Sequence, residues 1–252
     1  MASPRRILVT GGARGLGRAV VSALAASGHS IVFTYNSSTE AAETLAEELR
    51  GSYPGREFET RRLDLSDRAS VDAFVEALAD EEPFYGFVHN AGQSYDSLAA
   101  VMDQDRAEAV MQVNFWSLTR LAGAIVRRMT RARVGRIVMI GSVTALRGSV
   151  GNAAYAASKS ALLGYMRTLT LETAKRGVTV NYIAPGFIDT EMMAPYADYR
   201  EKMESQIPVG RFAAPEEIAA VADFLMSPAS CYMTGAVLPV DGGLTAAIPV
   251  HR

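Results

Sequence analysis

The chain has 252 residues, about half of them apolar and a fifth charged, which suits one globular domain with a large buried core. Its formal net charge of -2 excludes the global basic field that draws proteins to nucleic acid or anionic membranes. No apolar run approaches the roughly 20 residues of a membrane span, and the N-terminus lacks the apolar stretch of a signal peptide. With Cys231 as its one cysteine, we expect a soluble cytoplasmic protein that binds neither nucleic acid nor membrane.

Short apolar segments alternate with helical patterns along the chain. The predicted strands are apolar almost throughout, which is typical of parallel strands buried on both faces, and they span residues 6–10, 30–35, 57–63, 86–89, 135–140, 179–183 and 236–240. Apolar residues recur at helical spacing between Ala42 and Leu49, and again between Val71 and Leu78. This alternation predicts an α/β fold of the Rossmann type, with a doubly wound parallel sheet of about seven strands, helices on both faces and a single domain over residues 1–252.

Ligands of such sheets bind at the carboxyl ends of the strands, where the first strand leads into a glycine-rich loop. Gly11 permits the tight turn, Gly15 lets the main chain approach a pyrophosphate, and Gly17 lets the following helix pack closely on the strand. The N-terminus of that helix offers free amides to phosphates. An ordinary strand-to-helix turn is the alternative to the nucleotide-binding loop that we predict from Gly11, Gly12, Arg14, Gly15, Leu16 and Gly17.

The spacing Thr-Gly-x-x-x-Gly-x-Gly resembles the signature of the short-chain dehydrogenase/reductase family, whose members use a nicotinamide cofactor. NAD enzymes of this fold usually carry an acid after the second strand, where it holds the ribose 2′-hydroxyl. Here that strand is followed by Asn36 and Ser37, which can donate hydrogen bonds to a 2′-phosphate, while Arg14 can supply positive charge. We therefore predict NADPH as the cofactor. The alternative for Arg14 is a solvated loop residue.

Two later strand ends also match positions of this family. Asp64 and Leu65 match the position that contacts the adenine; the alternative for Asp64 is a helix cap, for which Asp67 is better placed. His89, where many relatives have asparagine, is interpreted as a neutral, hydrogen-bonded histidine rather than as a titrating group beside the cofactor. It precedes the family's Asn-Ala-Gly motif, whose main chain lies along the cofactor ribose, here Asn90, Ala91 and Gly92. The scattered histidines and the single cysteine predict no metal site.

Four side chains suit hydride-transfer chemistry. Tyr155 and Lys159 are four residues apart, which puts both on one face of a helix. A phenol with a pKa near 10 exchanges protons poorly at neutral pH, and a neighbouring ammonium and an oxidised nicotinamide should both lower that pKa. Ser142, at the end of the fifth strand, can hold the substrate oxygen beside the tyrosine. In the family, an asparagine at the place of Asn114 accepts a helix distortion and holds a water that relays protons to the lysine. We predict these four as catalytic residues, with Tyr155 and Lys159 also contacting the cofactor.

After the sixth strand, the resemblance implies residues around the nicotinamide. Pro185 and Gly186 match the turn below the ring, and Ile188 and Thr190 match positions that contact the carboxamide. Residues 191–206 then carry three methionines and two tyrosines. Flexible thioethers suit a lid that moulds to a substrate chain, and the alternative is a pair of helices packed on the core.

Within the family, the chain looks most like the β-ketoacyl-acyl-carrier-protein reductases, a likeness carried by residues 135–138, 184–192, 207–212 and 240–243. It implies NADPH-dependent reduction of a β-ketoacyl thioester to the β-hydroxyacyl thioester during fatty-acid, polyketide or polyene chain elongation. The alternatives are reduction of a free ketone, a sugar or an acetoacetyl-CoA-like thioester. A catalytically inactive nucleotide-binding scaffold is a further alternative, against which the complete catalytic set argues.

An acyl carrier protein is strongly acidic, so its reductase needs a local basic patch. Arg133 and Arg176 match positions that dock the carrier in such reductases. The alternative is that cations gather at helix C-termini because the helix dipole favours them. The wider cluster consists of Arg127, Arg128, Arg131, Arg133 and Arg136. Members of the family usually form tetramers, so we expect a homotetramer, with the apolar tail at residues 246–250 packed at an interface.

Overall fold

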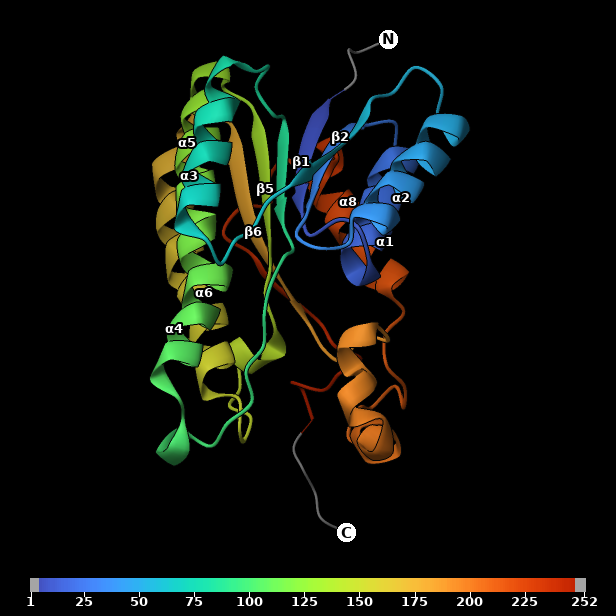
Figure 1. Cartoon of the computed structure of the whole chain (residues 1–252), viewed down its shortest axis with the longest axis vertical. Helices are drawn as coiled ribbons and strands as arrows, with labels where there is room; N and C mark the ends of the chain where they lie inside the picture. Colours follow the sequence, from blue (N-terminus) through green and yellow to red (C-terminus); the bar gives the residue numbers. More distant parts are fainter. Residues whose placement is uncertain (1–4, 248–252) are drawn as a thin grey trace.

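A single sheet of seven parallel strands forms the centre of the molecule (Figure 1), and the computed structural model describes residues 5–247. The strands follow the order β3-β2-β1-β4-β5-β6-β7, with all neighbours parallel. This is the predicted doubly wound Rossmann-type sheet, with its switch in strand order between β1 and β4. The strands are β1 Arg6–Thr10, β2 Ser30–Tyr35, β3 Phe58–Arg62, β4 Gly86–His89, β5 Gly135–Ile140, β6 Val178–Pro185 and β7 Val237–Val240.

The observed strands agree with the predicted ones to within two residues at each end. The largest difference is at β6, which continues past the predicted end at Ile183. There Ala184 and Pro185 stay in register with Pro239 and Val240 of β7. Proline is tolerated at this strand end because its missing N–H falls at the margin of the hydrogen-bonded ladder. This extension carries the turn at Gly186 to the edge of the sheet where ligands bind.

Helices cover both faces of the sheet (Figure 1). On one face lie α1 Gly15–Ala26, α2 Thr39–Ser52 and α8 Pro215–Met226, and on the other α3 Arg68–Ala77, α4 Gln104–Met111, α5 Ser117–Ala132 and α6 Ala153–Thr173. Each face has its own apolar core, and alternate residues of one strand serve both: Val138 of β5 packs in the α1 and α8 core, while Ile137 packs in the α5 and α6 core. This double burial explains why the strands are apolar almost throughout.

The helix between β4 and β5 is interrupted where the family resemblance implies a distortion. A π turn, η3 Gln112–Trp116, separates α4 from α5, and Asn114 lies within it. The N-terminus of α3 is capped as predicted, because the Asp67 side chain accepts a hydrogen bond from the main-chain N–H of Ala69 at 3.0 Å. The short elements are η1 Leu78–Asp80, η2 Ala99–Val101, η4 Val143–Ala145, η5 Ala174–Arg176, η6 Glu191–Tyr199, α7 Arg200–Glu204 and η7 Pro228–Ser230.

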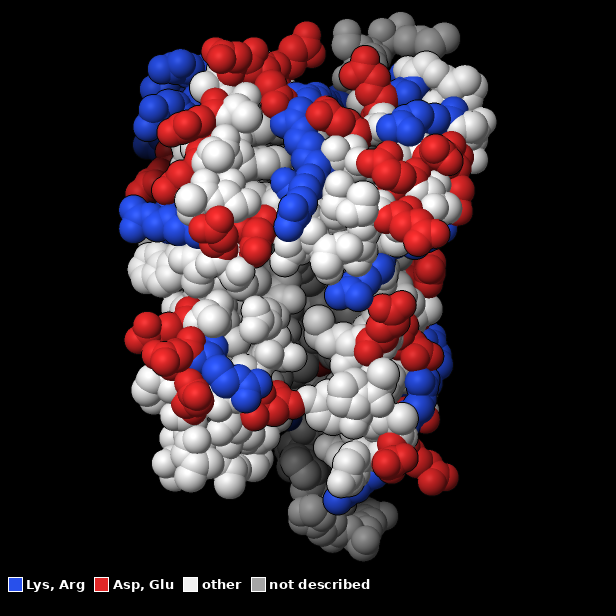
Figure 2. Space-filling view, in the orientation of Figure 1, with Lys and Arg blue, Asp and Glu red and all other residues white. Residues whose placement is uncertain are grey.

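Two surface properties bear on the expected partners. No helix within residues 5–247 has the length and apolar character needed to cross a membrane. Figure 2 shows basic and acidic side chains interspersed over the face that it presents, without a large area of one sign. The predicted single domain and the predicted interfacial tail include terminal residues, among them 248–250, that lie outside the described part of the chain.

Gly141, directly after β5, offers a test of the packing beneath the cavity. A Cβ at this position would overlap the buried ring of Tyr182, whereas a Cβ at Gly51 in α2 would meet no atom within 4 Å. We expect Gly141→Ala to lower the free energy of unfolding by about 3 kcal/mol and Gly51→Ala to leave it unchanged or slightly raised. Thermal melting of both variants beside the wild type measures the difference. Equal melting temperatures would show that the ring of Tyr182 can move away at little cost.

Candidate active site

A large open cavity lies along the carboxyl ends of the strands, with a volume of about 1650 Å³. Its walls come from the loops after β1, β2, β3, β4, β5 and β6 and from residues 190–208. Small-molecule sites usually measure ~300–1000 Å³, so this cavity has room for a dinucleotide and a second ligand together.

The cavity brings together most of the residues that the sequence nominates. Gly12 and Asn114 do not reach it. Gly12 is buried behind the loop, where a Cβ would collide with Phe33 and Val21, so this glycine serves the packing of the loop. Asn114 is fully buried beneath the floor. The nominated residues that line the cavity are Gly11, Arg14, Gly15, Leu16, Gly17, Asn36, Ser37, Asp64, Leu65, Asn90, Ala91, Gly92, Ser142, Tyr155, Lys159, Pro185, Gly186, Ile188 and Thr190.

The glycine loop has the geometry of an anion cradle. Gly11 and Gly15 adopt φ angles of 68° and 52°, which disfavour other residues, and a Cβ on Gly17 would overlap the carbonyl oxygen of Gly11. The side-chain amide of Asn90 donates to that same carbonyl at 3.0 Å and fixes the turn. No side chain caps the N-terminus of α1, where Arg14 is the N-cap residue, so its first N–H groups remain free for a phosphate.

The far end of the cavity suits a ribose phosphate. Asn36 and Ser37 are exposed at its rim, and Arg14 is 67% exposed, with its guanidinium 3.6 Å from Glu191 in a loose ion pair. Asp64 is engaged within its own loop, since its carboxylate accepts hydrogen bonds from the hydroxyl and the N–H of Ser66. These hydrogen bonds lower the pKa of Asp64. The main-chain N–H of Asp64 is engaged as well, since it donates to the hydroxyl of Ser70 at 3.1 Å.

Ser142, Tyr155 and Lys159 share the inner wall of the cavity. Tyr155 and Lys159 lie one turn apart on α6, with the ammonium 5.7 Å from the centre of the phenol ring. Lys159 is buried and donates a hydrogen bond to the carbonyl of Ile140, at the end of β5, at 2.9 Å. The hydroxyl of Ser142 accepts hydrogen bonds from both the N–H and the hydroxyl of Thr144, at 3.1 and 2.9 Å. Its own proton is therefore free to be donated into the cavity.

Burial dominates the electrostatics of this pair. It lowers the pKa of Lys159 to about 8 and raises the pKa of Tyr155 above its ordinary value, with a hydrogen bond from Ser142 acting in the opposite direction on the phenol. The expected lowering of the phenol pKa by Lys159 is therefore not found within the protein itself. The ammonium is directed at the carbonyl of Ile140, and desolvation of the phenolate is the largest influence on the pKa of Tyr155.

Asn114 supports this wall from below. Its amide oxygen accepts a hydrogen bond from the N–H of Gln93 at 2.8 Å, and its amide nitrogen donates to the carbonyl of Gln93 and to the hydroxyl of Ser158. A Cβ on Gly92 would lie 3.1 Å from the Lys159 ammonium and 3.3 Å from the Asn114 amide oxygen. The four predicted catalytic residues are thus close neighbours, with Asn114 behind the other three.

Tyr182, which the sequence did not point to, holds Ser142 and Lys159 in place through hydrogen bonds to their main chain. Its buried hydroxyl accepts from the N–H of Ser142 at 3.0 Å and donates to the carbonyl of Lys159 at 3.2 Å. Burial raises the pKa of this phenol, so it stays protonated and keeps both bonds. The sequence offered one signal for this role: a tyrosine in an otherwise largely aliphatic strand. The glycine at position 141 leaves the space that its ring occupies.

Residues 191–206 lie along the cavity and contribute side chains to its lining. Neither η6 nor α7 has a buried side chain, so this segment is not part of the core. Its anchors are Arg200, which donates two hydrogen bonds of 2.9 Å to Asp189, and Tyr196, which bonds to Asp96 across the opening. The structure favours the lid interpretation over the packed helix pair, with Met192, Met193, Tyr196 and Met203 facing the cavity.

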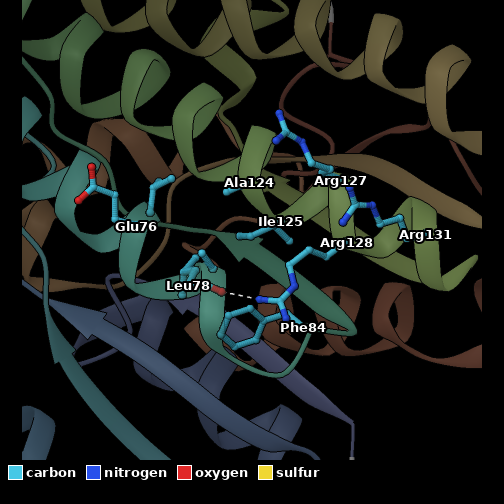
Figure 3. A pocket seen from close by; sticks show the side chains of 10 residues that line it. Glu76, Leu78, Phe84, Ala124, Ile125, Arg127, Arg128 and Arg131 are labelled. Atoms are coloured by element: carbon cyan, nitrogen blue, oxygen red, sulfur yellow. Dashed lines mark hydrogen bonds between the residues drawn. The ribbon is translucent and has the colours of Figure 1, made fainter.

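The arginines of the predicted basic cluster differ in their exposure and in their contacts. Arg136 is buried against the ring of Tyr85, so its place in a surface patch is wrong. Residues 135–140 follow the apolar pattern of a buried strand, and Arg136 is the exception. At the start of β5 its guanidinium donates a hydrogen bond to the carbonyl of the preceding residue, Gly135. Arg128 folds back onto the carbonyls of Leu78 and Glu81, and Figure 3 shows it beside Arg127 and Arg131 over a groove with an apolar floor.

Arg133 and Arg176 are exposed and lie close together. The Arg133 guanidinium donates to the carbonyl of Lys175 at 3.2 Å. Arg133 precedes β5 and Arg176 precedes β6, so both sit at the amino edge of the sheet, while the cavity lies at the carboxyl edge. Six residues of β5 separate the two edges by ~20 Å. Among residues 5–247, no three His, Cys, Asp or Glu side chains are placed to hold a metal ion.

Known proteins share both the sequence and the fold of this chain. A family model described as enoyl-(acyl carrier protein) reductase matches residues 11–245. A 3-oxoacyl-[acyl-carrier-protein] reductase of Pseudomonas aeruginosa is 42% identical over 240 residues, covering 94% of this chain and 96% of that protein.

Two solved structures extend the comparison. A short-chain dehydrogenase/reductase from Serratia marcescens is 32% identical, with a TM-score of 0.88 over 96% of this chain and 98% of its own. A protein from Beutenbergia cavernae, assigned as an NAD(P)-dependent gluconate 5-dehydrogenase and holding NADP at low occupancy, is 34% identical, with a TM-score of 0.92 over 98% of each chain. The glycine loop, the Tyr155–Lys159 pair and these matches agree: the chain belongs to the short-chain dehydrogenase/reductase family and is an oxidoreductase.

Proposed function

We propose that this enzyme reduces the keto group of a β-ketoacyl thioester, carried by an acyl carrier protein, to a β-hydroxyacyl thioester with NADPH. The observation that carries this proposal is the convergence of Ser142, Tyr155 and Lys159 on one wall of a cavity whose other end is a glycine-rich anion cradle. The choice of substrate is supported by the relative from Pseudomonas aeruginosa, which is named for this reaction.

The cavity fits NADPH. The uncapped N-terminus of α1 and the glycines around it suit the pyrophosphate, and Arg14, Asn36 and Ser37 suit the 2′-phosphate, as the NADP-bound structure from Beutenbergia cavernae also suggests. When bound, NADPH supplies a hydride to the carbonyl carbon of the substrate. The turn at Pro185 and Gly186, with Ile188 and Thr190, would hold the nicotinamide end, and Asn90 and its two neighbours would follow the ribose.

The protein's own groups deliver the proton. The Ser142 hydroxyl, with both lone pairs occupied by Thr144, has one proton to donate; it serves the phenol oxygen of Tyr155 in the free enzyme and would serve the substrate carbonyl oxygen once substrate is bound. Tyr155 donates its proton to that oxygen as it gains negative charge. Lys159 uses one N–H on Ile140 and has two left for the cofactor ribose and for stabilising the developing phenolate. Asn114 holds the helix behind the lysine in place.

Carrier docking at Arg133 and Arg176 has a geometric consequence. Since these arginines lie at the edge of the sheet opposite the cavity, a neighbouring copy of the chain with its cavity facing that edge would offer a second route for the acyl chain of a docked carrier. The expected homotetramer would provide such an arrangement. Trp116 on the π turn and Leu171 on α6 are exposed apolar side chains that suit an interface between copies. The cytoplasmic location and the polyketide or polyene pathway stay predictions.

Two of the comparisons each favour a different substrate. The relative from Beutenbergia cavernae favours a sugar acid as a second candidate, and the matching family model favours an enoyl thioester. A free ketone, a sugar, an acetoacetyl-CoA-like thioester and an inactive scaffold are the remaining alternatives from the sequence.

The first prediction concerns the phenol. Tyr155→Phe removes the proton donor, so the rate of NADPH oxidation with a short β-ketoacyl thioester should fall by a factor of about 100 to 10,000, because general acid catalysis contributes that much. NADPH binding, followed by fluorescence, should stay within about 2-fold of wild type. The matched control is Tyr165→Phe on the same helix. Oxidation with gluconate or reduction of an enoyl thioester, but not of the keto thioester, would instead identify one of the alternative substrates.

The second prediction concerns pH. Lys159 carries its charge below its pKa of about 8 and loses it above, while the raised pKa of Tyr155 keeps the phenol protonated over the same range. We expect kcat/KM for NADPH to be flat below pH 8 and to fall about tenfold per pH unit above it, because this parameter reports groups of the free enzyme. A decline that begins only near pH 10 would assign the loss to the phenol and contradict a role for the charged lysine.

The third prediction concerns the carrier. Replacing Arg133 with asparagine, which tolerates its left-handed φ of 54°, together with Arg176→Gln should raise KM for the carrier-bound substrate about 10-fold or more. KM for a small-thiol mimic should not change. The control pair, Arg127→Gln with Arg131→Gln, removes the same charge from the end of α5. Equal effects of the two pairs would indicate a general charge effect at helix ends.

A further inference from the structure

His89, the last residue of β4, occupies a fully buried position beneath the active-site wall. Its ring Nδ1 lies 3.1 Å from the hydroxyl of Thr10, at the end of β1. Burial, followed by the positive charge of Lys159, lowers the pKa of His89 to about 3, so the ring is neutral at physiological pH. The proposed chemistry gives this histidine no role.

The hydrogen bonds around Thr10 determine which ring nitrogen carries the proton. The Thr10 hydroxyl oxygen accepts from the main-chain N–H groups of Asn90 and Ala91, at 3.1 and 3.2 Å. A hydroxyl has two lone pairs and one proton, so with both lone pairs occupied it donates to Nδ1 of His89. Nδ1 is therefore the unprotonated nitrogen, and the ring proton must be on Nε2.

The Nε2–H group is a buried donor next to the π turn. Nε2 has no hydrogen-bond partner in this structure, and the polar group that acts on the ring in favour of its protonated form is the main chain of Asn114 in the π turn. The π turn changes which donors its carbonyls accept. Because the N–H of Ser117 bonds to the carbonyl of Gln112, five residues back, the carbonyl of Val113 takes the Ser117 hydroxyl instead, at 2.6 Å.

We propose that His89 is a positioning residue for carbonyl reduction: as a fixed Nε2–H tautomer, it links Thr10 of the glycine loop to the main chain of the π turn and so holds Asn114 behind Lys159. The part that concerns reduction rests on the proposed function. Asn114 in turn bonds to Ser158, the neighbour of Lys159 on α6. The chain of contacts thus runs from the cofactor loop through β4 to the helix that carries the proton donor.

The mutational test separates positioning from packing. His89→Leu fills a similar volume and removes the Nε2–H donor; we expect kcat to fall about 10-fold, with KM for NADPH within 2-fold and the melting temperature within a few degrees of wild type. His89→Gln places an amide N–H near the position of Nε2 and should restore kcat to within about 3-fold. The matched control is His29→Leu, since His29 is buried at the other edge of the sheet. A His89→Leu enzyme with wild-type kcat, or one in which kcat and melting temperature fall together without rescue by glutamine, overturns the proposal.

The tautomer itself is tested without any substrate. In the ¹⁵N-histidine-labelled full-length enzyme, long-range ¹H–¹⁵N correlation spectra, assigned by loss of signals in His89→Gln, should show the neutral Nε2–H form unchanged between pH 5 and 9. An Nδ1–H tautomer, or a ring that titrates in this range, overturns the proposal. If the wild type reduces no β-ketoacyl thioester, the proposed function fails. The kinetic comparison is then made on the carbonyl compound that it does reduce, and the spectra decide the tautomer independently.

Discussion

The ammonium group of Lys159 is buried against the carbonyl of Ile140, and this contact constrains the rest of the site. A buried charge is costly unless polar groups surround it, and the lowered pKa of the lysine records that cost. The same burial that lowers this pKa raises that of Tyr155, which keeps a proton on the phenol. The wall must therefore be held rigidly enough for three separate elements, β5, α6 and the π turn, to keep their polar groups in contact.

Strand order supplies much of this rigidity. Because β1, β4 and β5 are adjacent and parallel, the glycine loop, the Asn90 turn and Ser142 all emerge at one edge of the sheet. Cross-links between neighbouring strand ends then fix their spacing: Thr10 to the β4 turn, and Tyr182 of β6 to Ser142. These bonds lie below the cavity floor, where water does not compete with them.

The seven strands and the placing of most candidate residues could be predicted from the sequence, because buried parallel strands have a strong apolar pattern and strand ends gather at one edge. Prediction failed where a side chain's surroundings decide its role. Arg136 belongs by sequence to a basic cluster, but its side chain is buried against Tyr85. The raised pKa of Tyr155 could not be foreseen either, since spacing along a helix gives proximity to Lys159 but not the degree of burial.

The cavity and the proposed carrier-docking arginines lie at opposite edges of the sheet, and this separation affects how the enzyme would select its substrate. The cavity and the proposed chemistry lie at the carboxyl edge, whereas Arg133 and Arg176 are exposed at the amino edge of the same chain. A strand length of ~20 Å lies between the two edges. If these arginines recognise the carrier, recognition and reduction take place at opposite edges of the sheet. Selectivity for carrier-bound over free substrates then depends on the amino edge, while the intrinsic chemistry of the cavity does not.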